Sequence, residues 1–253
     1  MENIRIIPRL DIKGPNVVKG IFVEGLRVIG DPRKLAKRYY EEGADEILYL
    51  DVVASLYQRN LDFDLLRDVA EELFIPLTVG GGIRSIGDIE NALRAGADKV
   101  AINTYAIAHP EFLSEAAKRF GSQCIVLSVE AKKNDSGRWE AYTDGGREHS
   151  GVDAVEWVKK AVNLGIGEVV ITSIDKDGTK KSFDTELIAA ISSFATVPVI
   201  ACGGGGTLDS FAEVLKTCHA DAIAAASVFH YKDFAIGELK KFLSGKGFNI
   251  RIA

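Results

Sequence analysis

The chain has 253 residues, of which 47% are hydrophobic and 26% are charged, and its formal net charge is -5 at pH 7. This composition is typical of a globular protein with enough apolar material for a core, and the negative net charge argues against non-specific binding of nucleic acid. No apolar run approaches the roughly 20 residues that span a bilayer, and no terminal segment has the parts of a signal peptide, so we expect a cytoplasmic protein with no membrane partner.

Short runs rich in β-branched residues alternate with helical patterns along nearly the whole chain, which is typical of βα units on a parallel sheet. Asp31 followed by Pro32 indicates a helix start, and residues 153–164 carry apolar side chains at helical spacing. Eight strands are predicted, at residues 5–11, 46–51, 77–79, 99–102, 124–130, 168–172, 197–201 and 221–225.

Eight such units predict an α/β fold, a (β/α)8 TIM barrel, as a single domain over residues 1–253. A doubly wound open sheet is the alternative, because strand order cannot be read from a sequence. An internal repeat favours the barrel: residues 76–82 and 97–104 resemble residues 198–204 and 220–227, at an offset of about 122 residues. Two equal halves of four strands can close one ring.

Each half carries a glycine cluster between a strand and a helix, where bare backbone N–H groups could hold a phosphate. Tight turns are the alternative for one such cluster alone, but two matched clusters favour a ligand with a phosphate at each end. The residues expected to bind phosphate are Gly81, Gly82, Asn103, Thr104, Asp177, Gly178, Gly203, Gly204 and Ser227.

In each half, a carboxylate ends the first predicted strand. Asp11 and Glu130 would therefore face each other across the barrel mouth, as a general acid and base acting on one ligand. Capping or loop-orienting carboxylates are the alternative. Position alone does not single out this pair, because Asp51, Asp175 and Asp177 are also expected at strand ends.

Two long stretches, residues 13–30 and 132–151, follow the same two strands, and we expect them to be functional loops on the C-terminal face. At the opposite face, four charged residues stand at strand starts and alternate in sign, so they form either a solvated rim or a salt-bridged collar. They are Arg5, Glu46, Lys99 and Glu168.

The three cysteines, Cys124, Cys202 and Cys218, are scattered and have no metal-ligand spacing. They are expected to be core thiols. We predict no metal site and no cofactor.

The chain resembles, over essentially its whole length, the cyclase subunit family of imidazole glycerol phosphate synthase. Segments that carry the resemblance include residues 11–13, 17–20, 30–32, 42–46, 74–76, 79–85, 95–100, 119–124, 153–157 and 177–179. The resemblance implies that a glutaminase subunit docks on the barrel floor, with Asp98 in the docking face. It also implies that ammonia crosses a gate formed by Arg5, Glu46, Lys99 and Glu168. By the same resemblance, the ammonia is expected to attack a ribulosyl aminoimidazole carboxamide nucleotide with two phosphates, giving imidazole glycerol phosphate and aminoimidazole carboxamide ribotide.

Two residues depart from the family pattern at the mouth: Arg9 replaces a cysteine, and Glu130 replaces an aspartate. Side chains alternate along a strand, so Arg9 should point into the barrel with Arg5 and Asp11. A buried guanidinium requires a carboxylate partner, and the candidates are Glu130, Asp11 and Asp51.

Residues 23–31, 51–57 and 128–132 look more like the paralogous cyclase-like subunit of surface-polysaccharide gene clusters. By that resemblance the first hypothesis is a subunit that relays glutamine-derived ammonia to a sugar amidotransferase, for acetamidino-sugar formation. The alternative is an authentic histidine-pathway cyclase, a lyase with Asp11 as general acid and Glu130 as general base. A third hypothesis is a non-catalytic scaffold that activates the glutaminase.

Overall fold

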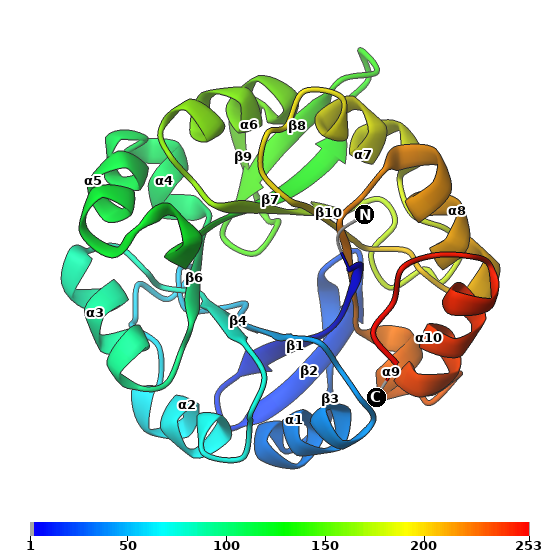
Figure 1. Cartoon of the computed structure of the whole chain (residues 1–253). Helices are drawn as coiled ribbons and strands as arrows, with labels where there is room; N and C mark the ends of the chain where they lie inside the picture. Colours follow the sequence, from blue (N-terminus) through cyan, green and yellow to red (C-terminus); the bar gives the residue numbers. More distant parts are fainter. Residues whose placement is uncertain (1–2, 253) are drawn as a thin grey trace.

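The computed structural model of the protein describes residues 3–252. Its centre is a closed ring of eight parallel strands, in which the last strand pairs with the first (Figure 1). The predicted (β/α)8 barrel is therefore correct, and the open sheet is excluded. In ring order the strands are β1 (Arg5–Lys13), β4 (Ile47–Asp51), β5 (Leu77–Gly80), β6 (Lys99–Ile102), β7 (Ile125–Lys133), β10 (Glu168–Ser173), β11 (Val199–Cys202) and β12 (Ala222–Ala225).

Helices surround this ring, one layer thick (Figure 1). Two helix starts predicted from the sequence are confirmed: the Asp31 side chain accepts from the Lys34 N–H with Pro32 in the first turn, and Asp153 caps the helix that begins at Ala154. The helices are α1 (Pro32–Glu41), α2 (Phe63–Ala70), α3 (Ile86–Arg94), α4 (Thr104–Ala108), α5 (Glu111–Phe120), α6 (Ala154–Asn163), α7 (Thr185–Ser192), α8 (Leu208–Cys218), α9 (Ser227–His230) and α10 (Ile236–Gly245), with a 3-10 turn, η1, at Ser122–Cys124. Among the described residues, none of these helices combines the length and the apolarity needed to cross a bilayer.

The barrel has two apolar layers because alternate strand residues face its inside and its outside. Strand side chains that point outward pack against the helices in the main core. Those that point inward form a plug across the barrel, which includes Ile7, Leu48, Val126, Val170 and Ile200. This plug separates the floor of the barrel from its mouth.

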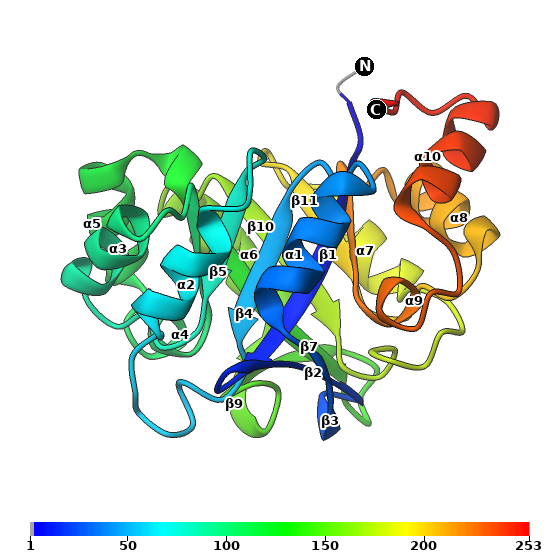
Figure 2. The same ribbon diagram turned by 90° about the horizontal axis from the view of Figure 1, so that it is seen from below.

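The two long stretches at the mouth, expected to be loops, are β-hairpins. Strands β2 (Asn16–Ile21) and β3 (Glu24–Gly30) continue β1 as an antiparallel ribbon, and β8 (Trp139–Thr143) and β9 (Glu148–Asp153) continue β7 in the same way. Because β1 and β7 are longer than the other barrel strands, their ends extend beyond the ring and require hydrogen-bond partners. Figure 2 shows β2, β3 and β9 at the end of the barrel opposite both termini.

Some strand ends differ from the predicted ones. Strand β10 ends at Ser173, so Asp175 and Asp177 lie in the following loop and do not end a strand as expected. Two of the three cysteines, Cys202 and Cys218, are buried as core thiols, whereas Cys124 is half-buried in η1.

Candidate active site

The floor of the barrel carries a closed ring of ion pairs. Arg5 Nη1 lies 2.8 Å from a Glu46 carboxylate oxygen and 3.1 Å from one of Glu168. Lys99 Nζ lies 3.0 Å from each of the same two residues. The Glu46 side chain is almost fully buried, so the four side chains form a collar across the floor and not a solvated rim. A small molecule entering from below would have to separate one of these pairs.

At the mouth, Asp11 and Glu130 come from β1 and β7, which start the two halves of the ring, and both are buried. The Arg9 Nε donates to Asp11 Oδ1 at 2.6 Å, and Lys19 Nζ donates to Asp11 Oδ2 at 3.1 Å. Burial favours the neutral carboxyl, but these two cations outweigh it and lower the pKa of Asp11 to about 2. Asp11 therefore stays ionised at neutral pH.

Glu130 has the opposite electrostatic environment. Within residues 3–252, its side chain accepts one hydrogen bond, from Asn103 Nδ2 at 3.1 Å. Burial raises the pKa of Glu130 to about 7; Arg9 opposes the rise, and the negative charges of Asp11 and Asp177 add to it. Of the two carboxylates, Glu130 is the one that can exchange a proton near neutral pH.

Of the three carboxylates expected as possible partners of Arg9, the one that pairs with it is Asp11. Glu130 accepts from Asn103, and Asp51 pairs with Arg59 at 2.7 Å. Asp11 is only two residues from Arg9 on the same face of β1, which makes it the nearest carboxylate for an inward guanidinium. The carboxylate that Arg9 holds ionised is therefore Asp11.

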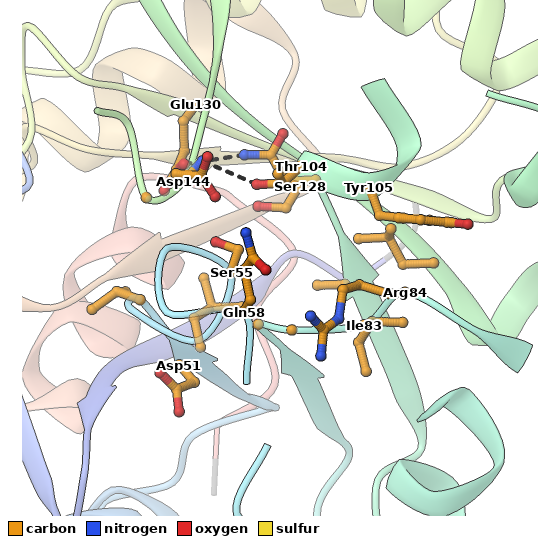
Figure 3. A pocket seen from close by; sticks show the side chains of 18 residues that line it. Asp51, Ser55, Gln58, Ile83, Arg84, Thr104, Tyr105, Ser128, Glu130 and Asp144 are labelled. Carbon is orange, nitrogen blue, oxygen red and sulfur yellow. Dashed lines mark hydrogen bonds between the residues drawn. The ribbon is translucent and has the colours of Figure 1, made fainter. Parts of the chain in front are cut away.

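The N-terminal-half glycine cluster opens into a cavity of about 410 Å³ (Figure 3). Gly81 and Gly82 have φ of 103° and 70°, a region in which a side chain would be strained. Both line the cavity together with Asn103 and Thr104. The Thr104 hydroxyl accepts from the Asp144 N–H, while the Asn103 amide points to Glu130. The residues expected to bind phosphate in this half therefore line the same cavity as the Glu130 carboxylate.

The C-terminal-half cluster forms a second, smaller cavity. It brings together the other five residues expected to bind phosphate, namely Asp177, Gly178, Gly203, Gly204 and Ser227. Gly203 and Gly204 also have positive φ, of 91° and 99°. The two cavities have no lining residue in common.

Several side chains at the mouth were not predicted from the sequence. Lys19, on β2, is buried and bridges Asp11 to Asp177, whose carboxylate lies 2.8 Å from its Nζ. Arg59 holds Asp51, and Arg84 lines the larger cavity, where Figure 3 shows it across from Glu130 and Asp144. The burial of Lys19 could not be predicted, because residues 13–30 were expected to form a loop and the hairpin that buries this lysine was not predicted.

Asp98 is exposed on the floor side, immediately before β6. Its carboxylate accepts from the Leu77 N–H at 2.8 Å, at the start of β5. Asp221 makes the same bond to the Val199 N–H in the other half. Beside Asp98 lies an apolar hollow with the exposed Phe74 in its rim.

Glu130 lines one of two glycine-lined cavities at the C-terminal face of a (β/α)8 barrel, which is the face that carries the active site in barrel enzymes. Residues 5–235 match the family described as "Histidine biosynthesis protein". The chain is 56% identical over 211 residues to the imidazole glycerol phosphate synthase subunit HisF of Legionella pneumophila, covering 83% of this chain and 100% of that protein. It is 51% and 48% identical, over 248 residues, to the subunits of the same name from Streptomyces avermitilis and Streptococcus sanguinis, covering 98% of each chain. The chain therefore belongs to the HisF family, a family of enzymes.

Proposed function

We propose that this chain is the cyclase subunit of an imidazole glycerol phosphate synthase. In that reaction, glutamine-derived ammonia attacks a ribulosyl aminoimidazole carboxamide nucleotide, and imidazole glycerol phosphate and aminoimidazole carboxamide ribotide are formed. The observation that carries the proposal is Glu130, a carboxylate with a pKa of about 7 that lines the larger of the two glycine-lined cavities. Identities of 48–56% to proteins named HisF support this function better than the sugar-amidation hypothesis that the sequence placed first.

The two carboxylates have different roles in this reaction. Ammonia loses a proton as its nitrogen bonds to carbon, and ionised Glu130 accepts that proton. Asp11, with both oxygens held by cations, stays negative and acts through its charge. This assignment differs from the sequence-based one, in which Asp11 donates a proton, because a carboxyl with a pKa of about 2 is almost never protonated at neutral pH.

A glutaminase partner would dock on the floor, over Asp98 and the hollow beside it. The relatives' names describe each of them as one subunit of a synthase. Ammonia released there would meet the ring of Arg5, Glu46, Lys99 and Glu168 as the first barrier on its way to Glu130.

The second candidate is the sugar-amidation relay, with a sugar amidotransferase as a further partner. Arg9 favours it, since this guanidinium stands inside the barrel where the family has a small thiol, and it engages Asp11. A subunit that only passes ammonia onward does not need a free acid at that position.

The test is to incubate the purified chain with the nucleotide and an ammonium salt, which bypasses the partner, and to quantify imidazole glycerol phosphate by mass spectrometry. Product formation that is lost in Glu130→Gln supports the cyclase. A folded chain that yields no product at any ammonium concentration rejects the cyclase and leaves the relay.

A further inference from the structure

Arg9 is an unusual residue for the inside of a barrel. It points inward from β1, and its side chain is only 1% exposed. Its Nη1 donates to Thr172 Oγ1 on β10 at 2.9 Å and lies 3.6 Å from the Cys202 sulfur on β11. Cys202 directly precedes Gly203, so the guanidinium lies at the base of the C-terminal-half cup, which it helps to line.

One donor of this guanidinium is unused. Nη2 is buried and has no hydrogen-bond partner within the part of the chain that the structure describes. A buried unpaired donor is costly, and more so when it carries charge, so native structures rarely retain one without a reason. An anion in the adjoining cup would supply the missing acceptor.

The charged residues that line the two cavities differ in balance. The C-terminal-half cup is lined by the cations Arg9, Lys19 and Lys180 and by one acid, Asp177. The larger cavity has one cation, Arg84, and three acids, which are Asp51, Glu130 and Asp144. Asp11 and Asp233, which do not line the cup, pair with these cations and balance their charge, so the C-terminal-half cup is near neutral whereas the larger cavity has an excess of acids. Glycine N–H groups are available in both, but only the C-terminal-half cup also presents a guanidinium donor without a partner among the described residues.

We propose that Arg9 is an anion-binding residue that makes the C-terminal-half cup the primary phosphate site of this protein. The cup takes the phosphate at one end of the ligand, and the larger, acidic cavity takes the other end beside Glu130, where glycine N–H groups bind the second phosphate more weakly. Arg9 thereby selects ligands with a dianionic end group on the C-terminal-half side. The inference rests on the proposed function only in that a phosphorylated ligand binds at the mouth.

The experiment titrates the purified chain, labelled with ¹⁵N, with inorganic sulfate and inorganic phosphate, and follows the backbone amide signals of both glycine clusters. We expect the signals of Gly203 and Gly204 to shift at a concentration at least tenfold lower than those of Gly81 and Gly82. Equal or reversed order in the wild type would overturn the proposal.

Two variants isolate the charge. Arg9→Met should weaken sulfate binding at Gly203 and Gly204 about tenfold or more, whereas Arg9→Lys should retain part of it. Arg94→Met is the matched control, because Arg94 is 73% exposed on α3 and its loss changes the net charge equally. Unchanged or tighter binding in Arg9→Met would show that Arg9 only obstructs the cup. These measurements need no turnover, so a chain that fails as a cyclase still tests the proposal, and a cyclase can still fail it.

Discussion

Asp11 lies in β1 and Glu130 in β7, the first strands of the two halves, and both strands continue past these residues; yet the pKa of Asp11 is about 2 and that of Glu130 is about 7. The difference arises from their neighbours. Asp11 receives Arg9 and Lys19, one on each oxygen, while Glu130 receives one amide N–H. The internal repeat therefore supplies two equivalent positions that the surrounding charges make chemically unequal.

The first prediction concerns the pH dependence of cyclisation. If ionised Glu130 accepts the proton from ammonia, kcat should rise about tenfold per pH unit below about 7 and level off above it. The measurement is kcat at a fixed concentration of free ammonia, adjusted at each pH. Glu130→Gln should lower kcat by about 10²- to 10⁴-fold and remove the dependence. A wild-type profile that is flat between pH 5 and 8 would contradict the role of Glu130.

The second prediction concerns stability. The pKa of Glu130 in the folded chain is raised from 4.5 to about 7, so the folded state binds this proton more tightly than the unfolded state. Its stabilising effect is complete below about pH 4.5 and is lost as pH rises through about 7. Relative to Glu130→Gln, the wild type should therefore lose up to roughly 3 kcal/mol of unfolding free energy between pH 5 and 8.

Urea unfolding at several pH values measures this difference. Glu111→Gln serves as control, because the Glu111 side chain is 80% exposed and its removal should leave the pH dependence unchanged. A constant difference between the wild type and Glu130→Gln would mean that Glu130 is not perturbed.

The third prediction is that both glycine clusters bind phosphate. A side chain at Gly204 would collide with the Ser182 carbonyl, and one at Gly82 would approach the Arg59 carbonyl to 2.5 Å, so bulky substitutions should distort each cup. Calorimetry with a bisphosphate ligand should show weaker binding for both variants, and the larger loss for Gly204→Val. Gly137→Val controls for backbone strain, since Gly137 also has positive φ but open space around it. Unaltered affinity in both cup variants would rule out the two-cup model.

The fourth prediction is that a glutaminase docks over Asp98. Asp98→Lys should weaken the complex or uncouple glutaminase stimulation, measured with the cognate partner. The variant also loses the bond to the Leu77 N–H, so Asp221→Lys, which loses the equivalent bond to Val199, is the matched control. Asp98→Asn keeps an acceptor and tests the charge alone. Full stimulation in Asp98→Lys would reject the docking face.

The fifth prediction concerns the two departures at the mouth. Arg9→Cys with Glu130→Asp restores the family pattern, frees one oxygen of Asp11, and should raise kcat for ammonia-dependent cyclisation above the wild-type value. Because Arg9 also binds anion, KM for the nucleotide should rise in the same variant. Glu130→Asp alone should not raise kcat, since Arg9 still holds Asp11. Wild-type turnover of about 1 to 10³ per second would show instead that both substitutions are tolerated.

Strand spacing and the repeat were enough to predict the barrel, because eight βα units with two matching halves leave few ways to bury their apolar faces. The floor residues were also predictable, since strand starts in a barrel share one end. Alternation along a strand is enough to predict which residues face inward, and it places Arg9 inside the barrel.

The contacts of Arg9 and Glu130 depended on the tertiary structure. Three carboxylates could have paired with Arg9, and only the closed ring shows that Asp51 is taken by Arg59 and Glu130 is turned to Asn103. The hairpin that carries Lys19 was equally hidden, because antiparallel pairing joins segments by registers that local sequence does not encode. The sequence thus determined the barrel and the types of residue at its mouth, whereas the proton affinities were decided by burial and by charges from distant strands, which act through space and not along the chain.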